Sequence, residues 1–492
     1  MLLGHLSLLS LWTIGTLALP PTAQRLRDAH AEIQFSPLTG RSQFTIPTFS
    51  NRLSQAFHVN SSALPLITFP LQDSWAGRLP IDPNPGETKD LFFWYWPSSA
   101  PGGSKTLTIW LNGGPGCSSL EGFLEENGPI RFEPGTPRPV LNPYAWTSVS
   151  DMLYIEQPVG TGYTTGMPNI TNESQLADQF YGFLQQFFTV FSELKTKQLY
   201  IAGESYAGMY IPYIATRIVD ASAAEKALLP LSLQGLLIND GVYSSFIVSE
   251  EAPTARFAAE YQSTLGLSTS QVQLLANLSL ACGYSSLLSS ATYPARGPIP
   301  LPNGNKDIVF PGCDVFDIFY NMAVGANPCF NIYRITDQCP TPADPIESYF
   351  SREDVQLQLH VPLSGTWNEC TPTPVFSTPT GSDASAYSSL LFPHLISLLP
   401  RGVTLWHGKR DSILFSLGDR VMIQNLTWGG VQGFQQEPSR PVVWEGKVWG
   451  VGGEERGLRY LEVEHAGHMI PQDQPGLALH VFSSLLGLAT LF

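Results

Sequence analysis

The chain has 492 residues, a formal net charge of −15, 43% hydrophobic residues and 14% charged residues. This length accommodates one large α/β domain with insertions, or two to three smaller domains. The acidic balance and the lack of any run of Lys and Arg exclude a nucleic-acid partner, because phosphate binding needs clustered basic side chains.

The two ends of the sequence are both apolar. Residues 1–19 end in small residues around Ala18 and are too short and too rich in Ser and Thr for a comfortable membrane span. We expect a secretory signal peptide there, cleaved near Ala18 or Ala23. Residues 477–492 lack the polar spacer and small-residue site of a lipid-anchor signal, so they predict a packing helix and no membrane anchor.

Between these ends the hydrophobic pattern alternates. Residues 20–75 are polar and contain proline, which predicts an N-terminal arm. From residue 76 to 243, strand patterns and helix patterns then follow one another. Strands are expected at 91–96, 106–111, 151–156, 199–202 and 236–239, and helices at 177–194 and 209–219. This order predicts an α/β fold with a central, mixed but mostly parallel sheet flanked by helices.

The alternation lapses between residues 244 and 390, where helical patches, a Gly/Pro-rich stretch and most of the cysteines occur. We interpret this segment as an inserted cap that divides the core into 76–243 and 391–492. Alternation resumes with expected strands at 403–407 and 458–463.

The cysteines and sequons agree with secretion. Six cysteines, an even number, predict three disulfides in an oxidising compartment, although six reduced thiols would fit a cytosolic protein instead. Their spacing offers no zinc pattern, and we expect neither a metal nor a cofactor. Five N-glycosylation sequons begin at Asn60, Asn169, Asn172, Asn277 and Asn425.

A serine lies in a sharp turn after the strand at 199–202. The hexapeptide at 203–208 reads Gly-Glu-Ser-Tyr-Ala-Gly, and a helix pattern follows it. Strand, tight turn with a serine, then helix is the context of a nucleophile elbow, in which Gly203 and Ala207 must be small. An ordinary turn that happens to contain Ser205 is the plain alternative.

The acid and base of a catalytic triad follow in the order typical of the α/β-hydrolase fold. Asp411 comes just after the strand at 403–407, and His468 comes just after the strand at 458–463. A serine hydroxyl becomes a nucleophile when a base removes its proton and an acid orients that base. His465 and His407 are rival bases, ranked below His468.

Four motifs together resemble the serine carboxypeptidases, and the fungal secreted or vacuolar members most of all. They are the elbow at 203–208, Trp-Leu-Asn-Gly-Gly-Pro-Gly-Cys-Ser-Ser at 110–119, Glu-Gln-Pro-Val-Gly-Thr-Gly-Tyr at 156–163 and Gly-His-Met at 467–469. The resemblance extends from about residue 74 to the C-terminus. It departs from the family at 408–411, where the usual Gly-Asp-x-Asp is Gly-Lys-Arg-Asp.

The resemblance implies a serine-type carboxypeptidase that acts on the C-termini of peptides and proteins through an acyl-enzyme, in a secreted or vacuolar compartment. Ser205, Asp411 and His468 would be catalytic, and the N–H groups of Gly114 and Tyr206 would form the oxyanion hole. The substrate carboxylate would bind to Asn112, Glu126 and Glu204, with Glu125 as the alternative to Glu126.

Two carboxyl groups that face a bound carboxylate place like charges together unless protons intervene. We therefore expect peptide hydrolysis to be best at acid pH. Glu121, by the same resemblance, helps to line the leaving-residue pocket and would favour basic C-terminal residues, although it would equally well point to solvent.

The resemblance also implies that Cys117 pairs with Cys370. For the other four cysteines we expect nested bridges, Cys282–Cys339 and Cys313–Cys329, out of three pairings that stay open. Two alternative functions use the same fold: an acyltransferase with the same triad, and an inactive binding protein. The sequence leaves the oligomeric state and the preferred C-terminal residue open.

Overall fold

The computed structural model describes residues 47–492, except 85, 134, 306 and 364. The expected signal peptide and residues 20–46 of the expected arm lie outside this range.

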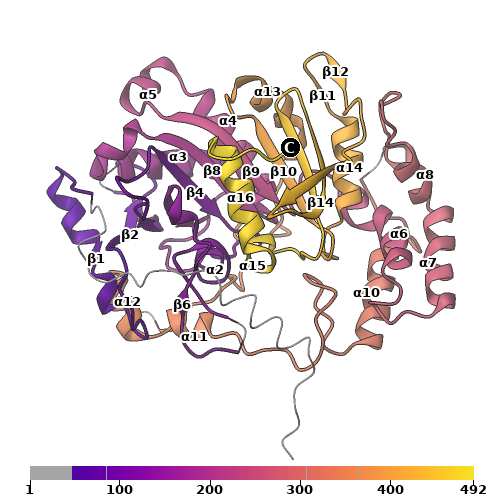
Figure 1. Cartoon of the computed structure of the whole chain (residues 1–492). Helices are drawn as coiled ribbons and strands as arrows, with labels where there is room; N and C mark the ends of the chain where they lie inside the picture. Colours follow the sequence, from indigo (N-terminus) through magenta and orange to yellow (C-terminus); the bar gives the residue numbers. More distant parts are fainter. Residues whose placement is uncertain (1–46, 85, 134, 306, 364) are drawn as a thin grey trace, which may run out of the picture. The chain divides into compact units, whose positions relative to one another are not determined.

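One large sheet dominates the described part of the chain (Figure 1). Its eleven strands run in the order β1-β2-β3-β7-β4-β8-β9-β10-β15-β14-β13. The six central strands, from β7 to β15, pair in parallel, and the outer strands pair antiparallel on both sides. The strands are β1 (His58–Val59), β2 (Ser74–Pro80), β3 (Asp90–Trp96), β4 (Thr106–Leu111), β7 (Asp151–Glu156), β8 (Gln198–Glu204), β9 (Ser232–Asn239), β10 (Val403–Gly408), β13 (Arg440–Trp444), β14 (Lys447–Glu455) and β15 (Leu458–Val463). Two small hairpins join β5 (Ile130–Arg131) to β6 (Val140–Leu141) and β11 (Thr427–Trp428) to β12 (Val431–Gln432).

Helices cover both faces of the sheet. Successive side chains of a strand point to opposite faces, so each strand contributes to the hydrophobic packing on both sides. In β3, Phe93 and Tyr95 belong to one hydrophobic cluster, whereas Trp94 and Trp96 belong to the other. The first cluster includes side chains of α3 (Glu173–Val190), α4 (Ala207–Val219), α13 (Phe392–Leu398) and α14 (Ser416–Asn425). The second includes side chains of α2 (Ser119–Gly122), α11 (Ile346–Phe350), α12 (Glu353–Gln358), α15 (Ile470–Asp473) and α16 (Pro475–Leu486).

Local sequence explains the longest helix, α3. Asn172 caps its N-terminus by accepting a hydrogen bond from the N–H of Gln175 (3.0 Å). Leu176, Phe180 and Phe187 recur at helical spacing and are buried against the sheet. The C-terminal helix α16 is likewise buried through Leu477, Val481 and Phe482, so the predicted packing helix is confirmed but ends at Leu486.

The segment 244–390, which the sequence predicts as one cap, packs in two parts. Its first part contains α6 (Ala252–Glu260), α7 (Thr269–Ala281), α8 (Tyr284–Ser289), α9 (Pro302–Asn305) and α10 (Val315–Ala326). Phe257, Leu275 and Phe319 share a separate hydrophobic cluster there. The second part, with α11 and α12, packs instead against the core of the sheet. The remaining elements are α5 (Ala223–Leu228), the π-helices η4 (Phe123–Asn127) and η7 (Ile247–Glu251), and the 3₁₀ turns η2 (Arg52–Phe57), η3 (Ser61–Ala63), η5 (Trp146–Ser148), η6 (Ser192–Thr196) and η8 (Ser388–Leu391).

The described part of the chain contains three disulfides: Cys117–Cys370, Cys282–Cys313 and Cys329–Cys339. The first is the pair that the resemblance implies, but the nested bridges Cys282–Cys339 and Cys313–Cys329 are wrong. Local hydrogen bonds explain the actual pairing. Tyr284, just after Cys282, donates its hydroxyl to the carbonyl of Cys313 (3.1 Å). Asn327 donates to the carbonyl of Asp337 (2.9 Å) and so brings Cys329 and Cys339 together.

No helix in the described ranges is both long enough and apolar enough to cross a membrane.

Candidate active site

Ser205 occupies the tight turn between β8 and α4. Its backbone φ is 60°, and its N–H donates to the carbonyl of Asn239 at the end of β9 (3.1 Å). A Cβ atom at Gly203 would lie 2.2 Å from the carbonyl oxygen of Leu111, so only glycine fits beside β4. The turn therefore presents Ser205 at the carboxyl edge of the parallel strands, as a nucleophile elbow requires.

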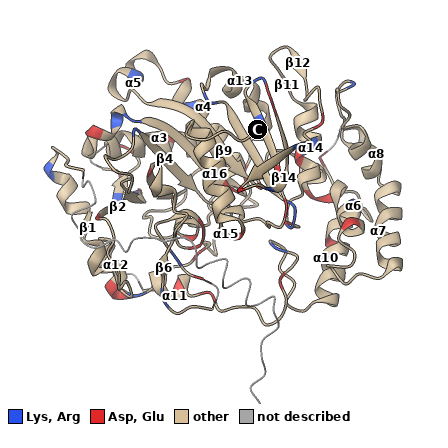
Figure 2. Ribbon diagram, in the orientation of Figure 1, with Lys and Arg blue, Asp and Glu red and all other residues tan. Residues whose placement is uncertain are grey.

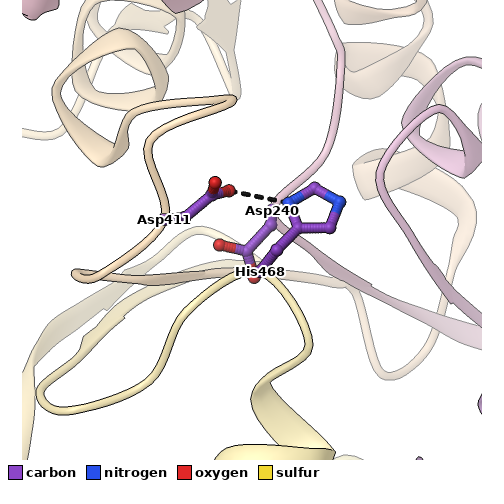
Figure 3. A group of neighbouring side chains, drawn as sticks. All are labelled: Asp240, Asp411 and His468. Carbon is purple, nitrogen blue, oxygen red and sulfur yellow. Dashed lines mark hydrogen bonds and ion pairs between the residues drawn. The ribbon is translucent and has the colours of Figure 1, made fainter. Parts of the chain in front are cut away.

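Two loops at the same edge bring Asp411 and His468 together (Figure 3). Asp411 follows β10 and His468 follows β15, which is the strand next to β10. His468 Nδ1 lies 2.7 Å from Asp411 Oδ2, and Asp411 Oδ1 accepts a hydrogen bond from the N–H of Ile413 (2.9 Å). Both side chains are buried. A buried carboxylate on Nδ1 fixes the tautomer of the imidazole and leaves Nε2 as the acceptor.

Ser205 and His468 line one pocket of about 160 Å³. His468 Nε2 is buried and has no hydrogen-bond partner among the described residues. No hydrogen bond joins Ser205 Oγ to it in this part of the chain, and catalytic hydrogen bonds often form only when substrate binds. Nε2 is thus an unoccupied acceptor in the pocket that Ser205 also lines.

The charge of His468 depends on its carboxyl neighbours. Burial disfavours the imidazolium, but Asp411, Asp240 and Glu204 outweigh it and raise the pKa of His468 to about 9. Burial also raises the pKa of Asp240 and of Glu204, so both acids take up protons above the usual carboxyl range. Asp240 and Glu204 stabilise the protonated form of His468 only while they are ionised themselves. At acid pH the pKa of His468 therefore falls.

Neither of the two rival histidines is among the residues that line this pocket. His465 is exposed, and it is not among the residues that line the pocket. His407 is buried, and its Nδ1 lies 2.8 Å from Asp419 Oδ2. Of the three candidate bases, only His468 lines the pocket with Ser205.

The glycine pair at 113–114 passes close to the elbow. A Cβ atom at Gly113 would lie 2.3 Å from the backbone nitrogen of Tyr206, so the missing side chain leaves that N–H accessible. Gly114 has a φ of 107° and also lines the pocket. The Tyr206 hydroxyl donates to Asp383 Oδ2 (3.0 Å), which anchors its ring away from the backbone. Gly114 thus lines the same pocket as Ser205, and the N–H of Tyr206 directly follows the nucleophile.

Asn112 and Glu204 line the pocket and are hydrogen bonded to each other. Asn112 Nδ2 donates to Glu204 Oε1 (2.9 Å) and to Glu121 Oε2 (3.2 Å). Glu204 Oε2 accepts a second bond from Asn239 Nδ2 (3.0 Å). Asn112 is itself oriented by Trp110 Nε1, which donates to its Oδ1 (2.7 Å). These bonds leave both side chains buried and fixed beside the nucleophile.

Glu126 is buried against Glu204. Neither carboxyl oxygen of Glu126 has a hydrogen-bond partner among the described residues. Two neighbouring carboxyl groups repel each other when both are ionised, so a proton on one of them is favoured. Burial first, and then the charge of Glu204, raise the pKa of Glu126 well above its usual value.

Further acids surround this pair, and Figure 2 shows red ribbon beside α15. Gln472 of α15 donates to Glu125 Oε2 (3.0 Å), so Glu125 is oriented toward that helix, and burial raises its pKa to about 8. Burial likewise raises the pKa of Glu121 well above its usual value and that of Glu369 to about 7. Both Glu121 and Glu369 line the pocket, whose lining contains no Lys or Arg.

Sequence reasoning missed three of the residues at this site. Tyr333 lines the pocket, its ring lies 5.2 Å from the ring of His468, and its carbonyl accepts from the N–H of His468 (2.8 Å). Glu369 stands in Trp-Asn-Glu-Cys, a segment that the sequence marks only for its cysteine. Asp240 follows β9 and is buried with a φ of 48°. Its place directly after a predicted strand was the one available signal.

Asp240, Asp411 and His468 form a compact group (Figure 3). One ligand atom of each lies within 4.8 Å of the others, a spacing that suits a metal ion. Asp411 and His468 are, however, hydrogen bonded to each other, and Asp240 Oδ1 accepts from the N–H of Gly408 (2.8 Å). Asp411 Oδ2 and His468 Nδ1 are thus bonded to each other, as a triad requires, whereas Asp240 Oδ2 has no hydrogen-bond partner among the described residues.

Comparison with known proteins agrees with this geometry. Residues 72–487 match the family model described as serine carboxypeptidase. The chain is 35% identical over 475 residues to a probable serine carboxypeptidase of Arthroderma benhamiae, with 89% of this chain and 87% of the relative covered. It is 33% identical over 508 residues to the serine-type carboxypeptidase F of Aspergillus niger, with 94% and 93% covered.

Among solved structures, Kex1(delta)p, a prohormone-processing carboxypeptidase from Saccharomyces cerevisiae, matches with a TM-score of 0.69 and 23% identity. The match covers 88% of this chain and 96% of that one, and it shows the α/β-hydrolase fold.

Proposed function

The chain belongs to the serine carboxypeptidase family, and from this premise we propose how its pocket releases C-terminal amino acids from peptides. Ser205 attacks the last peptide carbonyl while His468 Nε2 takes its proton, and Asp411 orients the imidazole and balances its charge. The leaving amino acid receives that proton from His468. Water then hydrolyses the acyl-enzyme by the same route. The distance of 2.7 Å between His468 and Asp411 supports these roles.

The N–H groups of Gly114 and Tyr206 stabilise the negative oxygen of the tetrahedral intermediate. Each adjoins the elbow, and the bare backbone at Gly113 keeps the Tyr206 N–H open. Because the donors are part of the backbone, they need no reorganisation when charge develops on the carbonyl oxygen.

The free carboxylate of the substrate binds to Asn112, Glu126 and Glu204, and this contact limits cleavage to the end of the chain. Asn112 Nδ2 donates to the substrate in place of its bond to Glu121 (3.2 Å), and a proton on Glu126 or Glu204 supplies a second donor. The pKa of each glutamate is raised by burial, so this proton is held at acid pH and lost as the pH rises. Peptide hydrolysis is therefore best at acid pH. The two alternatives, an acyltransferase and an inactive protein, gain no support from the relatives.

The decisive experiment follows products by mass spectrometry. A peptide with a free C-terminus loses residues stepwise from that end, and the same peptide with an amidated C-terminus and an acetylated N-terminus is not cut internally. Ser205→Ala lowers kcat by about 10⁶-fold, because no other group forms the acyl-enzyme. Internal cleavage of the blocked peptide would contradict the proposal, and so would an active Ser205→Ala enzyme.

The pocket favours a basic C-terminal residue. Glu121 and Glu369 line it without a neutralising Lys or Arg, so a substrate cation supplies the missing opposite charge. Burial raises the pKa of both groups, and the preference for Lys and Arg over Leu and Phe consequently increases as the pH rises through about 7, where Glu369 ionises.

Matched variants test this preference. Glu121→Gln and Glu369→Gln each reduce the Lys-to-Leu ratio of kcat/KM about tenfold near neutral pH, which is the effect of about 1.4 kcal/mol. Glu353→Gln, at an exposed position of α12, is the control and leaves the ratio unchanged. A ratio that none of the three variants alters would show that both acids are bystanders.

The protein acts in the secretory pathway, secreted or vacuolar, and carries N-linked glycans. The three disulfides support an oxidising compartment, as does the expected signal peptide. Asn60, Asn169, Asn277 and Asn425 are exposed, whereas Asn172 is half-buried and caps α3.

A further inference from the structure

His407 is a second buried histidine near the proposed triad, at the end of β10. Its Nδ1 lies 2.8 Å from Asp419 Oδ2. Its Nε2 lies 3.1 Å from the carbonyl oxygen of Leu414, 3.3 Å from Asp240 Oδ1 and 3.6 Å from Asp411 Oδ2. Both ring nitrogens thus face oxygen atoms, and those of Asp240 and Asp419, whose pKa values burial raises, accept hydrogen bonds while these acids are ionised.

While Asp240 and Asp419 are ionised, this geometry fixes the protonation state of His407. A neutral imidazole carries one N–H, so one of its nitrogens would face an acceptor with no proton between them. Only the imidazolium donates a hydrogen bond from both nitrogens. Two buried acceptors that face each other without a proton between them lower the stability of the folded state. Burial opposes the charge, but Asp240 and Asp419 outweigh it and raise the pKa of His407 to about 10, in agreement with the geometry.

The other cations of this loop point elsewhere. Lys409 Nζ pairs with Glu464 (3.0 Å) and Glu260 (3.3 Å). The guanidinium of Arg410 lies over the ring of Tyr261, 4.7 Å from its centre. His407 is accordingly the cation that approaches the same Asp411 oxygen to which His468 Nδ1 is bonded.

We propose that His407, held by Asp419, is a positively charged positioning residue that fixes the Asp411 carboxylate and disfavours a proton on His468 as the pH falls. The inference rests on the triad roles proposed above. A positive charge beside Asp411 stabilises its ionised form, and it also disfavours a second positive charge on His468. The second effect extends the activity of the base toward lower pH, and the first keeps Asp411 ionised so that it still orients the imidazole there.

Carboxyl groups from several elements face His407 and Asp411. Asp240 comes from the loop after β9, Asp419 from α14, and Glu462 from β15 acts on Asp419. Arg420 pairs with Glu462 (2.6 Å), which limits the charge that Glu462 exerts. Glu204 acts on His468 but is not among the groups that shift His407. Removal of the charge at position 407 therefore changes the balance between Asp411 and His468 most directly.

The test is the pH profile of kcat with an ester substrate that has no free carboxylate, so that the carboxylate-binding residues do not contribute. The acid limb of this profile is the pH range in which kcat falls because His468 is protonated. In His407→Gln it shifts upward by about one pH unit, and kcat at pH values below its midpoint falls about tenfold. Asp419→Asn shifts the limb in the same direction, and it serves if His407→Gln does not fold. His394→Gln, which breaks only the exposed pair with Asp220, leaves the profile unchanged.

A spectroscopic reading separates this inference from the proposed function. In the full-length enzyme with ¹⁵N-labelled histidine, NMR should show two ring N–H signals that persist to about pH 8 and vanish in His407→Gln. One ring N–H, or an acid limb that neither variant moves in an otherwise active enzyme, would overturn the inference alone. A wild-type enzyme that neither cleaves peptides nor reacts with a fluorophosphonate at Ser205 would overturn the proposed function instead.

Discussion

Glu204 adjoins the nucleophile and accepts two hydrogen bonds, from Asn112 and from Asn239. Burial favours its protonated form and outweighs the charge of His468 and the hydrogen bond from Asn239, so that its pKa is raised. One side chain therefore links the nucleophile turn to the place where we expect the substrate carboxylate.

This arrangement predicts how KM responds to pH. Since the pKa of Glu126 is raised by burial and by Glu204, its proton is present at acid pH and lost as the pH rises, and KM for a peptide then increases by up to about tenfold per pH unit. In Glu126→Gln the donor cannot ionise, so KM rises less steeply.

The comparison is steady-state KM between pH 4 and 8 for a free peptide and for its ester, in wild type and variant. The ester, which has no free carboxylate, is the internal control and keeps a nearly constant KM. Equal slopes for wild type and Glu126→Gln would assign the pH dependence to another group.

For single residues, the sequence identifies the site residues that lie within recognisable motifs. It does not identify those that reach the pocket from segments without a motif. Asn112, Ser205 and His468 stand in segments whose local backbone determines where they point. Tyr333 and Glu369 come from the inserted segment, and nothing in their own neighbourhood predicts that they meet the pocket. His407 was considered only as a rival base, because its pairing with Asp419 depends on α14 packing against β10.

Among the elements, the loop that the Cys329–Cys339 disulfide closes is hydrogen bonded to the two loops that carry Asp411 and His468. The N–H of Ile335 donates to the carbonyl of Arg410 (3.1 Å), and the N–H of Ser412 donates to the carbonyl of Ile332 (2.9 Å). The N–H of His468 donates to the carbonyl of Tyr333 (2.8 Å). Arg334 extends the contact by pairing with Asp473, which accepts from the N–H of Gly467 (2.6 Å).

Opening this loop should therefore impair catalysis more than opening its neighbour. In Cys329→Ser/Cys339→Ser the two triad loops lose a common support, and kcat falls on the order of a hundredfold, as a displacement of about 1 Å at a catalytic group can cause. Cys282→Ser/Cys313→Ser opens a bridge within the separate helical cluster and serves as the matched control. Thermal unfolding of both variants shows how much of the loss is instability, and equal activity losses at equal stability would contradict the role of the loop.

The elements of the sheet centre could be predicted because each parallel strand is a short apolar run between helices. All seven strands expected from the sequence are present. The outer strands β1, β2, β13 and β14 were missed, since they carry exposed, polar or glycine-rich residues. The pairing of Cys282 with Cys313 was also out of reach, because it depends on how α7 and α10 pack.

Across the whole molecule, buried carboxyl groups with raised pKa values recur. Burial raises the pKa of Glu156 to about 7 and that of Glu250 to about 8, and it also raises those of Glu173 and Asp240. For such a group the folded state binds a proton that the unfolded state has already lost. The contribution to stability is full below the unfolded pKa of 4.5 for a glutamate and is lost as the pH rises through the folded pKa.

The protein should accordingly be most stable at acid pH. Its Tm should fall between about pH 4.5 and 8, because each such group lowers the free energy of unfolding by up to about 1.4 kcal/mol per pH unit. Glu462, whose pKa is lowered by Arg420 despite burial, works in the opposite direction, as do Glu87, Glu193, Glu225 and Asp354, but such groups change the stability only below about pH 4.5. Calorimetry of wild type and Glu156→Gln across this range is the check, and the variant should show a shallower slope up to about pH 7. A Tm that rises toward pH 8 would contradict this account of the carboxyl groups.

The measurement that tests the central claim most directly is a crystal structure of Ser205→Ala with a bound peptide at acid pH. We predict that the terminal carboxylate lies on Asn112 Nδ2 and the Glu126–Glu204 pair, with the last peptide carbonyl oxygen directed at the N–H groups of Gly114 and Tyr206. A peptide whose C-terminus lies in solvent while its interior crosses the pocket would contradict the proposal that this enzyme recognises the free end of its substrate.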